Sequence, residues 1–276
     1  MRNLRLLIAY DGTNLAGWQR QANGETVQEE LERAFAVLTG EKLTVHGSGR
    51  TDAGVHALCQ NAHVHLAHPQ PPTDRMHLAL NSLLPPDIRV LRAMDMPAEF
   101  HARFSARGKR YLYRIRWSEV PSPIERRFSY WVPRVLDLDR MREAARHFVG
   151  EHDFVAMASN PGHAYVRPTV RRIQSIHLLR RKEGADLVVQ GSGFLYNQVR
   201  TMAGSLVEVG RGRQSPGWIS EVLDSRDRSQ AGPTLPPQGL FLLRVLYPEE
   251  FGGNGGARER SFQPKQVSGP TTGQRL

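Results

Sequence analysis

The chain has 276 residues, which is long enough for one large domain or two small ones, each with its own apolar core. It carries 37 Lys and Arg against 27 Asp and Glu, and this net charge of +10 favours a polyanionic partner, nucleic acid before membrane, because no apolar run approaches the ~18 residues of a spanning helix. The single cysteine, Cys59, excludes an internal disulfide and a multi-cysteine metal cluster, and a cytoplasmic location is the resulting expectation.

The N-terminal part of the chain alternates between strand and helix patterns. Strands are predicted at 4–10, 43–46, 55–66 and 88–94, where apolar residues alternate or run together. A helix is predicted to begin at Thr26, which forms a capping box with Glu29, and to end at Gly40. A second helix, 73–84, is ended by Pro85. The order of elements is β-α-β-β-α-β.

The C-terminal part repeats this order with insertions. Strands are predicted at 110–117, 170–179, 187–190 and 240–247, with an extra strand at 128–132. Helices are predicted after the cap Asp137, from Val199 and from Ser215. The pattern predicts an α+β protein with two ferredoxin-like halves, 1–105 and 106–251, which form a large, mostly antiparallel sheet with helices on one face. Residues 252–276 are rich in glycine and polar residues and are expected to be a disordered tail.

A glycine-framed loop presents one isolated carboxylate. Gly47, Gly49 and Gly54 surround Asp52, and we expect them to take positive φ so that the loop turns sharply. Arg50 lies two residues before Asp52, and an arginine so close would keep the carboxylate ionised and therefore nucleophilic or basic. The alternative is that Asp52 is an ordinary turn residue.

Basic residues gather in two acid-free runs. The first, 100–118, holds six basic residues with aromatic residues between them, and the second, 167–182, holds six more. Basic side chains contact phosphates and aromatic rings stack on unpaired bases, so this pattern indicates an RNA-binding groove. The alternative is that the charges cover solvated strand faces and that aromatics such as Tyr111 belong to the core.

Histidines provide a different candidate. His63 and His65 share a strand face and His68 follows, so a metal-dependent hydrolase is a hypothesis to weigh, against surface or core histidines. His56 is a candidate general base, although no serine or cysteine elbow accompanies it.

Five segments, taken together, resemble the tRNA pseudouridine synthase A family in the family's own order. They are GRTDAGVHA at 49–57, YDGT and GWQRQ at 10–21, FHARFSA and KRY at 100–111, FLYNQVR and GSL at 194–206, and GLFL at 239–242. The resemblance covers nearly the whole chain except the tail. The sequence departs from the family pattern at 15–16, where an aromatic is usual, at Cys59, where glycine is usual, and at Gln198, where methionine is usual. These departures fall outside the residues to which the family assigns chemistry, and they bear on substrate detail.

The resemblance implies a function and a set of roles. The family isomerises uridine to pseudouridine at positions 38, 39 and 40 of the tRNA anticodon stem-loop, as a homodimer without cofactor or metal, on a fold of two ferredoxin-like halves. By this resemblance Asp52 is the catalytic nucleophile or base, Tyr111 packs on the target ring, Arg200 pairs with Asp52, and Arg50 contacts RNA near the flipped nucleotide. The alternative is a non-catalytic RNA-binding protein that uses the same basic groove, with Asp52 as a turn residue only.

Overall fold

The structure, a computed structural model, describes residues 1–67, 71–159 and 168–252. The N-terminal elements are β1 (Arg2–Tyr10), α1 (Val27–Thr39), β2 (His46–Gly47), β3 (His56–Leu66), α2 (Thr73–Asn81) and β4 (Ile88–Met96). The C-terminal elements are β5 (Gly108–Trp117), β6 (Tyr130–Val132), α3 (Leu138–Arg146), β7 (Gly150–Asp153), β8 (Val170–Arg181), β9 (Gly184–Gly191), α4 (Gln198–Gly210), α5 (Trp218–Ser225) and β10 (Leu240–Leu246). The expected tail, 252–276, lies outside the described residues except for Gly252.

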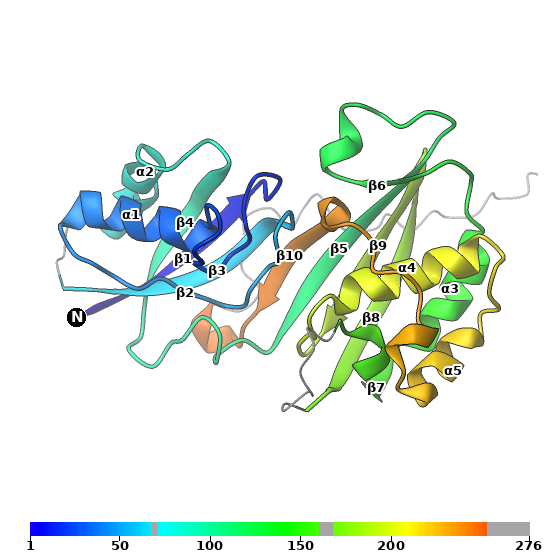
Figure 1. The fold of residues 1–276 in the computed structure, drawn as a ribbon. Coiled ribbons are helices and arrows are strands. Elements are labelled where there is room, and N and C mark those ends of the chain that lie inside the picture. The colour runs from blue at the N-terminus through cyan, green and yellow to red at the C-terminus, as the bar shows by residue number, and fades with distance from the viewer. Residues whose placement is uncertain (68–70, 160–167, 253–276) are drawn as a thin grey trace, which may run out of the picture.

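Within the described ranges, ten strands form one sheet with the order β4-β1-β3-β10-β5-β9-β8-β7, while β2 pairs with β3 and β6 with β5 (Figure 1). Among these pairs only β3 with β10 and β5 with β6 are parallel. The prediction of an α+β fold with a large, mostly antiparallel sheet is therefore confirmed. The last strand, β10, joins the two parts of the sheet, because it lies between β3 and β5.

The helices cover one face of this sheet. Tyr10, Ala57, Leu242 and Tyr111 form one row across four neighbouring strands, so their side chains share a face. These residues pack in a single apolar core with residues of α1, α2, α3, α4 and α5. In Figure 1, α1 and α4 lie in front of the sheet.

Local signals account for most element boundaries. The Thr26 hydroxyl accepts a hydrogen bond from the backbone N–H of Glu29, and Gly40 ends α1 with a φ of 74°. Asp137 caps α3 by accepting from the backbone N–H groups of Asp139 and Arg140. No helix in the described ranges has the length and apolar character that crossing a membrane requires.

Several predicted boundaries differ from the structure, and one strand was not predicted. Of the strand expected at 43–46 only His46 lies in a strand, the two-residue β2, which pairs with the same edge of β3 as β10. Helix α2 ends at Asn81 rather than at residue 84, since the chain turns before Pro85. β7 was not predicted, because its sequence, Gly-Glu-His-Asp, has no apolar alternation; it pairs only with β8 at the edge of the sheet.

Candidate active site

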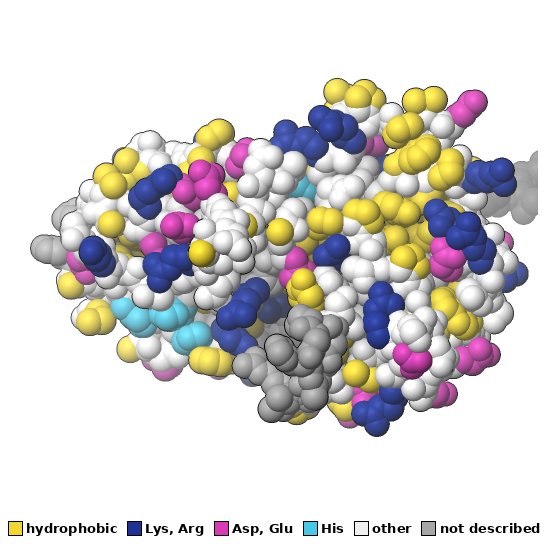
Figure 2. All heavy atoms as spheres, in the orientation of Figure 1, with side chains coloured by type: hydrophobic (Ala, Val, Ile, Leu, Met, Phe, Trp, Pro, Cys, Tyr) yellow, Lys and Arg dark blue, Asp and Glu magenta, His cyan; other side chains and the backbone are white. Residues whose placement is uncertain are grey.

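A cleft of about 1190 Å³ lies between the N-terminal and C-terminal parts of the molecule. Its walls include the loop around Asp52, the loop after β4, strand β5 and the turn before α4, together with residues from segments 16–21 and 44–47. Figure 2 shows Lys and Arg side chains gathered at the hollow between the two parts. The Asp52 loop and Tyr111, which the sequence placed in separate halves, therefore meet in one site.

The glycines of the Asp52 loop allow close packing of neighbouring groups more often than they provide a positive φ. Only Gly54 of the three expected positions has a positive φ, 76°, so the expectation for Gly47 and Gly49 was wrong. A Cβ added at Gly47 would lie 2.4 Å from the indole of Trp18. The loop is held from the same side by the backbone of Trp18, whose N–H donates to the carbonyl of Thr51. The opening segment of the chain thus fixes the loop that presents Asp52.

Asp52 lies in a partly buried position beside a guanidinium. Its carboxylate is 27% exposed, and its Oδ2 is 3.7 Å from Nη1 of Arg200. Burial raises the pKa of Asp52 above the usual range, and the charge of Arg200 opposes this rise. Arg50 is exposed and is not among the groups that shift the pKa of Asp52, so the expectation that Arg50 keeps this carboxylate ionised was wrong.

Arg200 is held in place by its own helix and by the chain that precedes β10. Its Nε donates to the carbonyl of Leu235, and its Nη1 donates to Oδ1 of Asn197, both at 2.7 Å. Asn197 takes a left-handed conformation, with a φ of 60°, immediately before α4. Arg200 does not line the cleft itself but lies behind Asp52. This geometry suits a residue that orients a carboxylate.

Tyr111 forms part of the apolar wall. Its side chain is almost completely buried, and its ring meets the ring of Phe194 edge-on with centroids 5.0 Å apart. Burial raises the pKa of Tyr111, and the charges of Tyr10 and Asp52 add to the rise. A neutral aromatic face next to a carboxylate can pack against a base that enters the cleft.

The charges that line the cleft are unbalanced. Asp52 is its only acidic lining residue among the described residues, while Arg50, Arg103 and Lys109 also line it. None of these three cations makes an ion pair with a described acidic residue. A cleft with unpaired cations and one carboxylate is suited to a polyanion whose reacting group meets that carboxylate.

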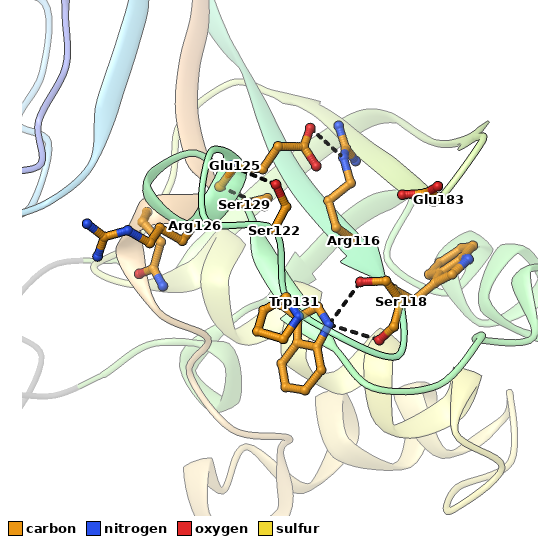
Figure 3. A pocket seen from close by; sticks show the side chains of 11 residues that line it. Arg116, Ser118, Ser122, Glu125, Arg126, Ser129, Trp131 and Glu183 are labelled. Carbon is orange, nitrogen blue, oxygen red and sulfur yellow. Dashed lines mark hydrogen bonds and ion pairs between the residues drawn. The ribbon is translucent and has the colours of Figure 1, made fainter.

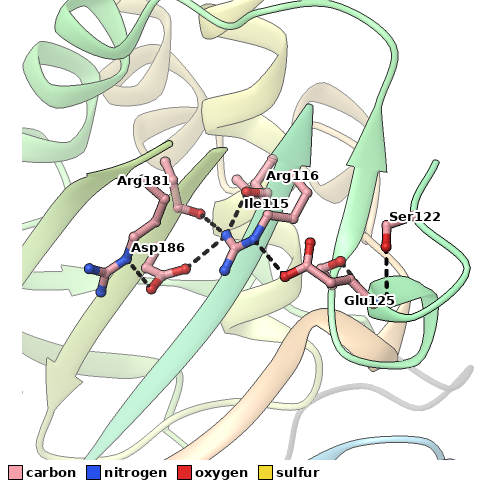
Figure 4. A network of polar contacts seen from close by, with 8 residues as sticks. Ile115, Arg116, Ser122, Glu125, Arg181 and Asp186 are labelled. Carbon is pink, nitrogen blue, oxygen red and sulfur yellow. Dashed lines mark hydrogen bonds and ion pairs between the residues drawn. The ribbon is translucent and has the colours of Figure 1, made fainter. Parts of the chain in front are cut away.

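Other basic residues of the same run point away from the cleft. Alternation along β5 puts Arg110, Arg114 and Arg116 on the face opposite to Tyr111, and none of them lines the cleft. Arg116 lies between Asp186, at 3.0 Å, and Glu125, at 3.6 Å (Figure 4). Of the first basic run, Arg103 and Lys109 therefore line the cleft, and these three arginines do not.

A second, smaller cavity of about 160 Å³ lies beside β6, on the chain between β5 and α3 (Figure 3). Ser118, Glu125 and Trp131 line it, and the Trp131 indole N–H donates to the carbonyl of Ser118 at 3.0 Å. It shares no lining residue with the cleft. The cleft, which contains Asp52, is therefore the candidate active site.

Neither His56 nor His63 lines the cleft. His56 is buried outside it; its Nδ1 accepts from the backbone N–H of Gly12 and its ring stacks on Phe241. His63 is buried, and its Nδ1 accepts from the backbone N–H of Ala102. In the described part of the chain no group of three or more His, Cys, Asp or Glu is arranged to hold a metal ion. His68 lies outside the described residues.

Sequence reasoning gave no individual role to several residues that line the cleft. Lys109 and Phe194 line the wall next to Tyr111, and Phe104 lines it with a side chain that is 76% exposed. The alternation of β5 could have identified Lys109, since it lies two residues before Tyr111 and shares its face. Nothing in the local sequence indicates that Phe194 meets Tyr111, because the two are brought together only by the sheet and α4.

Comparisons with known proteins agree with the geometry. The tRNA pseudouridine synthase family model matches residues 6–105 and 144–248. Three relatives, each named tRNA pseudouridine synthase A, come from Geobacter sp. strain M21, Acetivibrio thermocellus and Caldicellulosiruptor bescii. They are 47%, 44% and 43% identical to this chain, and each match covers 90% of this chain and 100% of the relative. The family match includes the loop around Asp52, the loop after β4 and the turn before α4, and the chain belongs to the tRNA pseudouridine synthase family of isomerases.

Proposed function

We propose that this protein isomerises uridine to pseudouridine at positions 38, 39 and 40 of the tRNA anticodon stem-loop, with Asp52 as the catalytic nucleophile. The observation that carries the proposal is the position of Asp52: it is the single described carboxylate that lines a basic cleft, and Arg200 and Tyr111 accompany it. Family membership supports tRNA as the substrate.

The chemistry requires that the C1′–N1 bond breaks, the uracil rotates, and a C1′–C5 bond forms, while C5 loses a proton and N1 gains one. A carboxylate can act by attacking the sugar or the base, or by taking a proton from the ribose. Both the broken and the formed bond lie within one nucleotide, so we propose no metal or cofactor.

The neighbouring residues have separate roles in this proposal. Tyr111 packs on the target ring, and Arg200 orients the carboxylate of Asp52 from behind. Arg50, exposed at the rim, contacts RNA beside the flipped nucleotide. Extruding a paired base costs a few kcal/mol, which contacts between the RNA backbone and the cleft cations offset.

The proposal includes the assembly and location expected from the family. We infer a cytoplasmic homodimer in which each chain is divided into halves at residues 105 and 106. Sedimentation equilibrium of the purified protein tests the dimer, and a monomer at every protein concentration would contradict it.

Mapping of the modified nucleotide tests the function directly. Unmodified tRNA transcripts with a single uridine at position 38, 39 or 40 are incubated with the protein, and pseudouridine is located by carbodiimide labelling and primer extension. We expect modification in each of the three transcripts and none in a matched transcript with cytidine at all three positions. Modification only outside the anticodon stem-loop would contradict the proposed specificity, and no modification of any tRNA would contradict the activity.

A further inference from the structure

Lys109 is the cleft cation that lies deepest in the protein. It is on β5, two residues before Tyr111 and on the same face, and it lines the cleft with Tyr111 and Gly49. Arg50 and Arg103, the other two lining cations, are exposed at the rim. Strand geometry fixes Lys109 in register with the residue that forms the apolar wall.

Gly49 leaves the space that the end of this lysine occupies. A Cβ added at Gly49 would lie 2.1 Å from Nζ and 3.1 Å from Cε of Lys109, and these are the only atoms that it would approach within 4 Å. Gly49 does not have a positive φ, so its backbone conformation is open to other residues. Because residue 49 has no side chain, the end of the Lys109 side chain can lie against the Asp52 loop.

The ammonium of Lys109 has no partner in the folded protein as described. Within residues 1–67, 71–159 and 168–252 it makes no hydrogen bond or ion pair. Burial and the nearby charge of Arg103 lower the pKa of Lys109 to about 8. Lysine has three donors and no acceptor, so a largely buried ammonium without an acceptor is favourable only when a ligand supplies the anion.

Asp52 does not supply that anion. The charge that acts on the pKa of Asp52 is that of Arg200, and Lys109 has no ion pair with Asp52. The two arginines of the rim are also cations and leave the charge of Lys109 unbalanced.

We propose that Lys109, aligned by Gly49, binds a single phosphodiester of the RNA strand adjacent to the nucleotide that enters at Asp52. This inference rests on the proposed function, because it takes the ligand of the cleft to be tRNA. One phosphate held at a fixed distance from Asp52 sets the register in which the target uridine enters.

The first test measures tRNA binding at equilibrium against salt concentration for the parent, Lys109→Met and Lys109→Arg. Met keeps most of the length of the side chain without its charge, whereas Arg keeps the charge at every accessible pH. We expect Lys109→Met to weaken binding about tenfold and to lower the slope of log affinity against log salt by about one, with most of both effects restored in Lys109→Arg. An unchanged slope in Lys109→Met would overturn the proposal.

The second test identifies the phosphate. Anticodon stem-loop RNAs are made with one phosphodiester at a time replaced by an uncharged methylphosphonate. One replacement next to the target uridine should weaken binding by the parent about tenfold and should have no further effect on Lys109→Met. Equal losses in both proteins at every position would show that Lys109 contacts no particular phosphate.

Gly49→Ala keeps the lysine but closes its path, so it provides a variant that does not depend on how Lys109→Met folds. We expect tRNA binding by Gly49→Ala, like binding by Lys109→Met, to be unaffected by the methylphosphonate that weakens binding by the parent. If that methylphosphonate still weakens binding by Gly49→Ala, the role of Gly49 is overturned. The pH dependence adds a further readout: parent affinity should fall as pH rises through about 8, where Lys109 loses its proton, while Lys109→Arg should not change there.

Measuring turnover by the parent protein distinguishes a failure of the proposed function from a failure of the role proposed for Lys109. If the parent forms no pseudouridine in any tRNA, the proposed function fails. If the parent forms it and Lys109→Met has the same affinity, salt slope and methylphosphonate profile as the parent, only the role of Lys109 fails.

Discussion

Basic side chains on the two faces of β5 differ in whether they have acidic partners. On the face toward the helices, Lys109 lines the cleft and has no described acidic partner. On the other face Arg116 lies between Asp186 and Glu125, and Asp186 also pairs with Arg181 at 2.7 Å. The basic run of the sequence thus contains Arg116, whose charge is paired within the protein, and Lys109, which has no described acidic partner.

This division shows why the number of basic residues is a poor guide to a binding surface. Asp186 is buried, and the arginines beside it stabilise a buried carboxylate. The cations that line the cleft make no ion pair with a described acidic residue, so their charge is available to phosphates. The following predictions compare the two regions, from the largest expected effect to the smallest.

The largest difference is expected between two carboxylates. Asp52→Asn should lower single-turnover pseudouridine formation by on the order of a thousandfold or more, because an amide is neither nucleophile nor base, while tRNA affinity stays nearly unchanged. Glu125→Gln, on the opposite face, is the matched control and should turn over normally. Release of tritium from C5-labelled tRNA measures both rates, and substantial residual turnover by Asp52→Asn would remove Asp52 from the chemistry.

Arg200 is expected to act through the orientation of Asp52. Arg200→Lys keeps the charge but loses the planar fork, so turnover should fall about tenfold with little change in stability. Arg200→Ala removes the charge that opposes the raised pKa of Asp52, so this pKa should rise further and the acid limb of the rate profile should move to higher pH. Single-turnover rates against pH measure both effects. A Lys variant as active as the parent at every pH would show that the fork has no role.

The two faces should also differ in their dependence on salt. Arg103→Ala should weaken tRNA binding about fivefold and lower the salt slope by about one. Arg116→Ala should leave the salt slope unchanged but should destabilise the fold by on the order of 1–2 kcal/mol, since Asp186 loses one of its partners. Equal salt slopes for the two variants would mean that only net charge matters.

The smallest expected effect is a decrease in folding stability at low pH. Burial lowers the pKa of His63 to about 4, so between pH 6.5 and pH 4 the unfolded chain binds a proton more readily than the folded protein does. Stability should therefore fall as pH is lowered through this window, by on the order of 1 kcal/mol near pH 5.5.

His63→Asn serves as the comparison for this pH effect, since an amide oxygen can still accept from Ala102 but does not titrate. His46, His65 and His101 surround His63 and remain in both proteins. Urea unfolding at several pH values measures the difference between the two. Parallel stability curves would show that His63 does not contribute.

The sequence by itself determined the element order, the family and the isolated position of Asp52. Strand alternation, the caps at Thr26 and Asp137, and the glycine after α1 are local signals, because each depends on neighbouring residues or on the periodicity of one element. The alternation of β5 also places Lys109 and Arg110 on opposite faces of the strand, although the interpretation of the basic run treated the two residues alike.

Only the tertiary structure decided which distant groups meet and how strongly each is buried. Sheet pairing and helix packing bring Arg200, and not the neighbouring Arg50, to Asp52, and burial raises the pKa of Asp52, an effect that the local sequence does not show. β7 lies at the edge of the sheet, and the two-residue β2 pairs only with β3. The pairing of such short strands depends on the partner strand and not on a local apolar pattern. Electrostatic interaction and desolvation depend on distance and on access to water, and in this protein the folded arrangement of the sheet sets both.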